Sequence, residues 1–291
     1  MIRALLPLSL ALGIHLPHAA HAEPGAPAAG GAPASCEARV SAVLSFDSNR
    51  LPQLSPRTPL TLEWIERIVF LSSADANSSL QDCERLLREV RAHLSTYIHR
   101  RLESHLTAGR LEILQHEMTL LKTLHNSSTT RAALEGALPA DLSTRYLEQL
   151  RDRLFARLSL SPWSQYRDLG FSLEEWTPEW RVALGTDSVA ATSLRDARVA
   201  LAPFALPPGE LEYFLFHELA HLAHWRAFPR EHASLRRSER FAWSATLDFI
   251  AWRTEQHDAI PAEIRRLQNL ITGLGLDGWT SIVLRARGLL D

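Results

Sequence analysis

The sequence predicts a mostly α-helical protein, in which an N-terminal helical region precedes a small α+β core with a short sheet. Apolar residues recur at helical spacing through most of residues 36–160. Beyond residue 160 this period weakens, and two short runs have the alternating or β-branched character of strands. Of the 291 residues, 46% are hydrophobic and 22% are charged, so a packed globular protein is expected rather than a disordered one.

Residues 1–22 have the three parts of a secretory signal peptide. Arg3 lies near the start, an apolar run extends from Ala4 to Ile14, and the segment ends in Ala-His-Ala, which matches an A-x-A cleavage site. We therefore expect an exported protein, periplasmic or secreted, from a bacterial host. The apolar run is shorter than the ~20 residues that span a bilayer, so no stable membrane insertion is expected.

Residues 23–35 consist almost wholly of Pro, Gly and Ala, and they predict a linker. Cys36 follows this linker, and Cys83 is the only other cysteine. Two cysteines in an exported chain predict a disulfide, and two separate buried thiols are the alternative. The formal net charge of -2 does not fit a strongly basic surface, so no nucleic-acid partner is expected.

Residues 36–160 predict a helical domain. Periodic apolar runs favour helices over about 79–106 and 110–124, and Gly109 between them allows the turn of a helical hairpin. A further helix is expected over about 139–158, because leucines and a tyrosine recur there along one stripe. Five histidines of this region do not converge at metal-ligand spacing and are expected at the surface: His93, His99, His105, His116 and His125.

Residues 161–291 predict a second domain, which holds the short sheet. Strands are expected at Trp180–Leu184 and Arg198–Leu201, with turn residues between them. The Pro-Pro-Gly run at 207–209 then interrupts regular structure. A strongly apolar helix is expected to begin near Glu210, with acidic residues in its first turn that suit the helix dipole.

This apolar helix contains an HExxH motif, formed by His217, Glu218 and His221. Two histidines four residues apart on a helix can both reach one metal ion. A carboxylate beside them can take a proton from a zinc-bound water, whose pKa the metal lowers. The motif therefore predicts one zinc ion per chain, with His217 and His221 as ligands and Glu218 as general base.

A catalytic zinc needs a third protein ligand and one open position for water. Glu239 meets this need, because it lies on the inward, apolar stripe of a helix expected over about 233–252. The interval between His221 and this glutamate is long enough for the first helix to end and the second to cross it. The alternative is that Glu239 pairs with an arginine such as Arg236 or Arg237.

Three other histidines compete as ligands. His224 lies on nearly the same helical stripe as the motif, but seven residues separate it from His217, which is ~10.5 Å along the helix axis and too far for one ion. His232 and His257 stay open as alternatives. Either can act as a ligand or can stabilise the oxyanion that develops when water attacks a carbonyl.

An HExxH motif within an apolar helix, after a strand-like run and before a downstream glutamate, resembles the zincin superfamily of metallopeptidases and is similar to its gluzincin branch. The resemblance covers about residues 180–252. It implies a zincin-like catalytic core in which His217, His221 and Glu239 bind zinc and Glu218 activates water. By the same resemblance, the substrate is a peptide or protein.

The sequence departs from the family pattern in its details. Thermolysin-like gluzincins have an aspartate four residues after the glutamate, where this chain has Trp243, so the partners that orient the ligand histidines are unassigned. Metzincins are excluded, because His224 and Ala227 occupy their glycine and final histidine positions. The strand that aligns a peptide at the edge of a zincin cleft corresponds, by order, to Arg198–Leu201.

The sequence therefore predicts an exported zinc-dependent peptidase with an N-terminal helical region. One alternative is a binding or chaperone-like protein that keeps a zincin shape with a structural or vestigial metal site. A second alternative is a metal-free helical interaction protein in which the motif is coincidental. The sequence makes no prediction of the oligomeric state.

Overall fold

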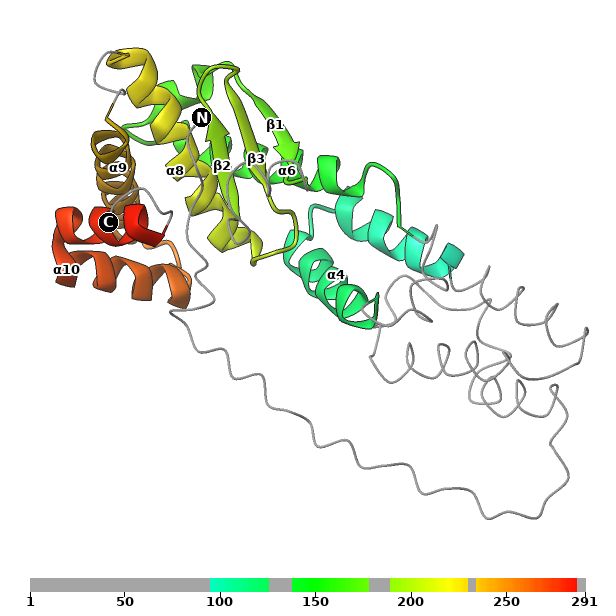
Figure 1. The fold of residues 1–291 in the computed structure, drawn as a ribbon. Helices are drawn as coiled ribbons and strands as arrows, with labels where there is room; N and C mark the ends of the chain where they lie inside the picture. Colours follow the sequence, from blue (N-terminus) through cyan, green and yellow to red (C-terminus); the bar gives the residue numbers. More distant parts are fainter. Residues whose placement is uncertain (1–94, 126–137, 178–188, 230–233, 287–291) are drawn as a thin grey trace, which may run out of the picture. The chain divides into compact units, whose positions relative to one another are not determined.

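The computed structural model describes residues 95–125, 138–177, 189–229 and 234–286 (Figure 1). These residues divide between two compact units, separated at the Leu142–Ser143 bond. The described part of the chain is mostly helical with a small three-stranded sheet, as predicted. No helix within it is long and apolar enough to cross a membrane.

Several predictions fall outside the described residues. They are the signal peptide, the linker, the pairing of Cys36 with Cys83, the strand Trp180–Leu184 with its following turn, and the positions of His93, His232 and the side chain of His125.

The N-terminal unit contains the predicted helical hairpin. A helix over 95–107 ends in a turn at Gly109, whose φ of 64° is a left-handed conformation that glycine adopts without strain, and α4 (Leu111–His125) follows. A buried ion pair between Arg101 and Glu117 joins the two helices. Nε2 of His105 lies 3.3 Å from the same carboxylate.

His105 corrects the prediction of a surface histidine. Its side chain is buried, whereas His99 and His116 are exposed as expected. Burial is the main cause that lowers the pKa of His105, and the Glu117 carboxylate opposes this effect. The sequence pattern did not reveal the burial, because it depends on how the two helices of the hairpin pack together.

The first helix of the C-terminal unit is α6 (Leu142–Leu158), which belongs to it from Ser143 on and whose apolar stripe is buried as predicted. A short 3-10 helix, η3 (Ser164–Asp168), follows. Tyr166 of η3 stacks on Phe216 with ring centroids 5.4 Å apart, and Phe216 stacks on Phe249 at 4.1 Å. These aromatic contacts form part of the core that holds the long helices of this unit together.

The sheet of the C-terminal unit has the strand order β1-β3-β2. It consists of β1 (Ser172–Glu175), β2 (Ala190–Ser193) and β3 (Arg198–Leu201). β1 pairs with β3 in parallel, and β2 pairs with β3 antiparallel. The prediction of a strand at Arg198–Leu201 is confirmed, but β3 is central among the described strands, so its expected position at the edge is wrong.

Among the described strands, β1 and β2 lie at the two edges of the sheet, and β2 packs against α8 (Pro208–Ala227). Ala191 of β2 and Ala200 of β3 pack with Trp176 on one face of the sheet. Because side chains alternate along a strand, Thr192 lies on the opposite face, where α8 packs. β2 was not predicted, since Ala-Ala-Thr-Ser lacks the large β-branched and aromatic residues that mark most strands.

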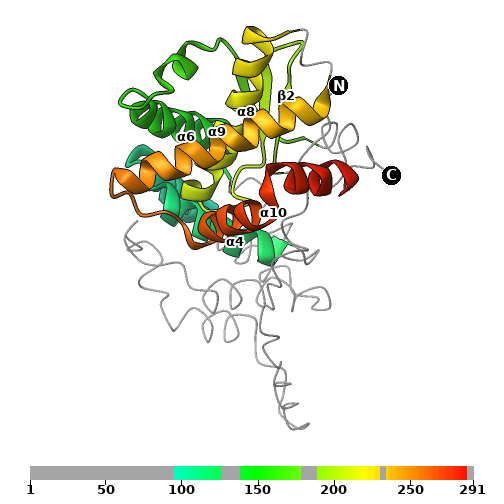
Figure 2. The same cartoon turned by 90° about the vertical axis from the view of Figure 1, so that its left-hand side faces the viewer.

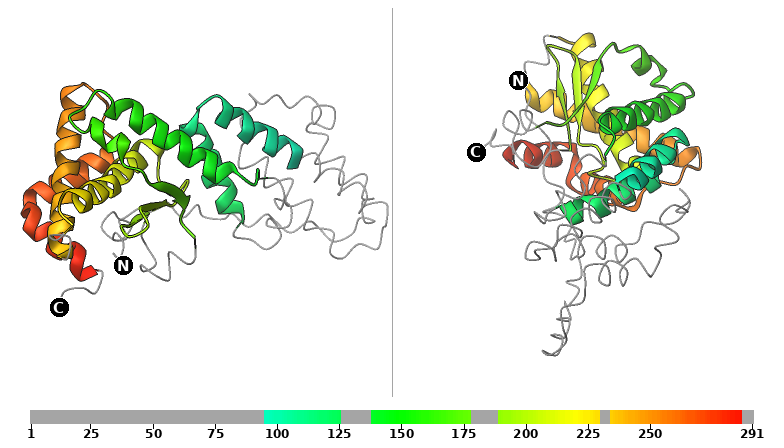
Figure 3. Two further views of the ribbon diagram at one scale, coloured as in Figure 1. Left: turned by 90° about the horizontal axis from the view of Figure 1, so that it is seen from above. Right: turned by 90° about the vertical axis from the view of Figure 1, so that its right-hand side faces the viewer.

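Three long helices complete the C-terminal unit (Figure 2). α8 begins with Pro208 in its first turn, where a proline costs no hydrogen bond, and it is followed by α9 (Leu235–Glu255) and α10 (Ala262–Ala286). Gly275 interrupts α10 with a φ of 68°. The sheet covers one side of α8 and α9 packs on another, so most of α8 is buried (Figure 3).

A buried carboxylate near the start of α8 anchors this helix. The two oxygens of Glu212 lie 3.0 Å from Arg153 and 2.9 Å from Arg157, both on α6, and 3.5 Å from Arg253 on α9. Three guanidinium groups around one buried carboxylate supply the charge partners that its burial requires. These ion pairs connect α8 to α6 and α9. On α8, Glu212 lies about one and a half turns before the HExxH motif.

Candidate metal centre

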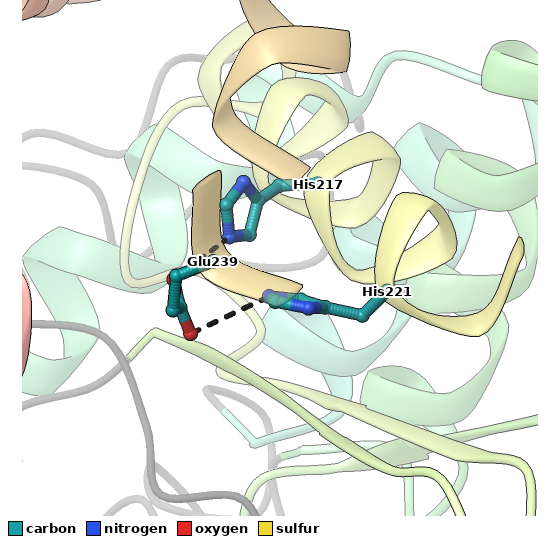
Figure 4. Close-up of side chains that lie close together, drawn as sticks. All are labelled: His217, His221 and Glu239. Atoms are coloured by element: carbon teal, nitrogen blue, oxygen red, sulfur yellow. Dashed lines mark ion pairs between the residues drawn. The ribbon is translucent and has the colours of Figure 1, made fainter. Parts of the chain in front are cut away.

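His217, His221 and Glu239 meet in the interior of the C-terminal unit (Figure 4). The two histidines project from α8, and the glutamate comes from α9 across the crossing of the two helices. One ligand atom from each residue lies within 4.8 Å of the other two. The side chains are almost inaccessible to solvent, with 0% of His217 and 1% of Glu239 exposed.

The distances between these atoms fit a site for a shared cation. Nε2 of His217 lies 3.8 Å from one oxygen of Glu239, and Nε2 of His221 lies 3.5 Å from the other. In a tetrahedral zinc site with bonds of ~2.0 to 2.2 Å, neighbouring donor atoms are about 3.3 to 3.6 Å apart. The group can therefore hold a metal ion after small adjustments of the side chains.

The ring orientation of His217 is fixed by a hydroxyl on α9. Nδ1 of His217 lies 3.2 Å from Oγ1 of Thr246, and that hydroxyl donates its own hydrogen to the carbonyl of Ala242 at 2.7 Å. Oγ1 therefore accepts from Nδ1–H, which leaves the lone pair of the neutral ring on Nε2. This Nε2 is buried and makes no hydrogen bond. A buried acceptor without a partner is unfavourable, and coordination of a metal ion would satisfy it.

His221 has an equivalent partner on the same helix. Its Nδ1 lies 2.7 Å from Oγ of Ser238, the residue immediately before Glu239. When Nδ1–H donates to Ser238, the lone pair lies on Nε2, which faces the carboxylate of Glu239. Both histidines thus present Nε2 toward the same point, and α9 supplies the third donor as well as both orienting hydroxyls.

Trp243 does not orient the ligand histidines through a hydrogen bond, because its buried indole nitrogen makes none. Its ring packs against His217 with centroids 4.2 Å apart and makes an edge contact with Trp279 of α10 at 5.5 Å. The tryptophan therefore forms an apolar wall beside the ligand ring. Thr246 and Ser238 supply the hydrogen bonds that orient the histidines.

The side chain of Glu218 contacts the sheet. Thr192 of β2 donates a hydrogen bond to its Oε2 over 2.6 Å. Both side chains are buried, with 3% of Glu218 and 2% of Thr192 exposed. Within the described part of the chain, the metal-ligand group consists of the other three residues and does not include Glu218.

The structure also places two of the competing histidines and the arginine alternatives. His224 is buried, but it stacks on Phe241 with centroids 4.5 Å apart and is not part of the group, while His257 is exposed. Arg236 and Arg237 lie on the exposed side of α9, and Arg236 donates to Ser281 of α10. The buried Glu239 therefore faces the histidines and not these two arginines.

Sequence reasoning missed Thr192, Ser238 and Thr246. Thr246 lies seven residues after Glu239, on the same side of α9, so its spacing carried a usable signal. Ser238 carried a weaker signal, as a polar residue beside the glutamate in an apolar stretch. Thr192 carried none, because it reaches the motif only through the packing of β2 on α8.

Comparison of the chain with known proteins finds no matching family model, no matching curated protein and no matching solved structure. What the centre can do therefore follows from its own donor atoms and their surroundings.

Proposed function

We propose that this chain is an exported zinc-dependent peptidase, in which His217, His221 and Glu239 hold one zinc ion and Glu218 acts as general base. The observation that carries the proposal is the buried group of two imidazoles and one carboxylate. The residue after the first of these histidines is Glu218, which supplies a second buried carboxylate. The signal-peptide pattern of residues 1–22 supports export.

The donor set favours a catalytic zinc over a structural one. Structural zinc sites usually have four protein ligands, most often with cysteines, whereas hydrolytic sites have three and keep a position for water. Two histidines and a glutamate are a known set for zinc hydrolases. Among the described residues, the group has these three members and no cysteine.

Each side chain has a distinct task in the proposed reaction. His217 and His221 present Nε2, with Thr246 and Ser238 holding their Nδ1 atoms, and Glu239 supplies the negative charge. When bound, zinc would polarise a substrate carbonyl and lower the pKa of water toward ~7. The Glu218 carboxylate would take the proton from that water and later deliver it to the leaving amine.

A peptide substrate is favoured by the position of the sheet. β2 lies at the edge among the described strands and packs against α8, which contains the motif. An edge strand can pair with an extended peptide through backbone hydrogen bonds. Together with the zincin resemblance, this supports hydrolysis of a peptide bond.

One observation favours a second candidate, a non-catalytic protein with a structural metal site. The ligand side chains and Glu218 are all nearly inaccessible to solvent, as in a closed site. In such a protein, zinc would stabilise the crossing of α8 and α9 and no substrate would reach it. This candidate predicts a bound metal without hydrolysis.

A Glu218→Gln variant separates the two candidates. Wild type and variant are purified without chelator, their zinc content is measured, and each is incubated with a mixture of denatured proteins whose new termini are identified by mass spectrometry. For a peptidase, we expect chelator to abolish cleavage and zinc to restore it. The variant should keep its zinc but cleave at least about 100-fold more slowly, because the general base is lost.

The matched control is Glu255→Gln, which makes the same chemical change at an exposed position on α9. It should cleave at the wild-type rate. Zinc binding with no cleavage by the wild type would favour the structural site, and equal rates for wild type and Glu218→Gln would exclude Glu218 as the base.

A further inference from the structure

The carboxylate of Glu218 is held by a hydroxyl from the sheet and not from its own helix. Oγ1 of Thr192 lies 2.6 Å from Oε2 of Glu218 and 3.4 Å from the backbone oxygen of the same residue. The hydroxyl has one hydrogen, and the shorter contact to the side chain is where it is donated. A separation of 2.6 Å lies within the range of charge-assisted bonds from a hydroxyl to a carboxylate.

The direction of this hydroxyl is fixed by its own surroundings. Threonine is β-branched, so its χ1 angle is restricted more than that of serine. The backbone of Thr192 is paired with Val199 of the central strand β3, and its side chain is buried against α8. The donor is therefore anchored to a rigid element and does not depend on the motif helix for its position.

We propose that Thr192 is a positioning residue, whose hydroxyl fixes the carboxylate of Glu218 and so determines how this general base is presented to the water to be activated. This inference rests on the proposed function. A carboxylate on a helix next to an ion can rotate about its side-chain torsions or turn toward the metal itself. A fixed donor on one oxygen opposes both movements, and a misplacement of ~1 Å at a reacting group can cost about 100-fold in rate.

A purely structural role for the same hydrogen bond makes a different prediction. If Thr192 only fastens β2 to α8, its loss would lower thermal stability and zinc content while leaving the turnover of the folded, zinc-bound enzyme unchanged. If it positions Glu218, the loss appears in kcat, with zinc content and KM retained, because the hydroxyl bonds to the general base and not to a ligand of the metal.

The test compares Thr192→Val with Thr192→Ser in the full chain with zinc bound. Valine keeps the shape of threonine and removes the hydroxyl, whereas serine keeps the hydroxyl. On a peptide identified as a wild-type substrate, we expect valine to lower kcat by about 10- to 100-fold with KM within about twofold, and serine to restore most of the rate. The control is Thr254→Val on α9, which makes the same chemical change at a hydroxyl that donates to the carbonyl of Ile250.

Each outcome has a defined meaning. A valine variant with wild-type kcat, or a serine variant as slow as valine, would overturn the positioning role while leaving the peptidase intact. If valine does not fold, Thr192→Ala replaces it, since a smaller side chain cannot clash, and the comparison with serine is unchanged. A wild type that binds zinc but cleaves nothing would overturn the proposed function and this inference with it.

Discussion

Thr246 donates its hydroxyl hydrogen to the carbonyl of Ala242 and therefore accepts a hydrogen bond from Nδ1 of His217 at 3.2 Å. One back-bonded threonine on α9 thus determines which nitrogen of a histidine on α8 carries the lone pair. Glu239 lies two turns earlier on α9. The same helix therefore supplies the carboxylate of the group and orients the ring of His217.

Removing this hydroxyl should weaken the metal site without unfolding it. For Thr246→Val we expect zinc affinity to fall by about 10- to 100-fold, the usual effect of losing a hydrogen-bond partner of a ligand histidine. Competition with a chromophoric chelator measures this. Thr254→Val is the control, because Thr254 donates to the carbonyl of Ile250 on the same helix. Equal affinities of the two variants would contradict the orienting role.

Ser238 should act in the same way on the other ligand. Its hydroxyl lies 2.7 Å from Nδ1 of His221, so Ser238→Ala leaves that nitrogen without its partner. We expect a loss of zinc affinity of about 10-fold or more in the same competition assay. Ser244→Ala, on the same helix, should bind zinc as the wild type does. An unaffected Ser238→Ala variant would show that His221 does not need this bond.

Glu212→Gln should destabilise the C-terminal unit. The substitution keeps the size of the side chain but removes a fully buried negative charge; of the three arginines around it, Arg253 is itself buried, while Arg153 and Arg157 are partly exposed. Loss of one partner of a buried ion pair costs about 3 kcal/mol or more. Urea unfolding at one fixed zinc concentration measures this. The control is Asp152→Asn, which breaks an exposed pair with Arg151 and should lower the free energy of unfolding by less than about 1 kcal/mol. An equally small loss for Glu212→Gln would contradict this prediction.

Glu210 should make the folded protein less stable above pH 6 than below pH 4.5. Burial, together with repulsion from Glu263, raises the pKa of Glu210 from 4.5 to about 6. The folded state therefore holds this proton more tightly than the unfolded state, and the free energy of unfolding falls as pH rises from 4.5 to about 6.

A Glu210→Gln variant should lose this dependence. With allowance for solvent screening, we expect it to be more stable than the wild type by about 1 kcal/mol at pH 7, and the difference should shrink toward pH 4.5. Urea unfolding of wild type and variant at pH 7 and at pH 4.5 measures the difference in the free energy of unfolding at each pH. A constant difference between variant and wild type across this range would mean that Glu210 does not titrate as described.

The sequence was most informative where function depends on local spacing. His217 and His221 share a face of α8 because they are four residues apart, and this holds wherever the helix packs. Glu239 could be placed opposite them because its own helix has a clear apolar stripe. The stripe predicted that the residue faces inward, and the crossing of α8 and α9 brings it to the histidines.

Features that depend on contacts between distant segments could not be predicted in the same way. β1 and β2 are four residues each, and pairing with β3 stabilises them more than their own composition does. The edge position of β2, and with it the contact between Thr192 and Glu218, follows from strand order, which no local pattern encodes. The burial of His105 likewise depends on the packing of two helices across a hairpin, where it lies beside Glu117.

In the proposed function, Glu239 completes a metal site with His217 and His221. The most direct measurement is the zinc content per chain of wild type and Glu239→Ala, purified side by side without chelator and quantified by mass spectrometry of the metal. We expect one zinc ion per wild-type chain and almost none in the variant, with both chains folded. A wild type without metal, or a folded variant that keeps a full zinc ion, would contradict the claim.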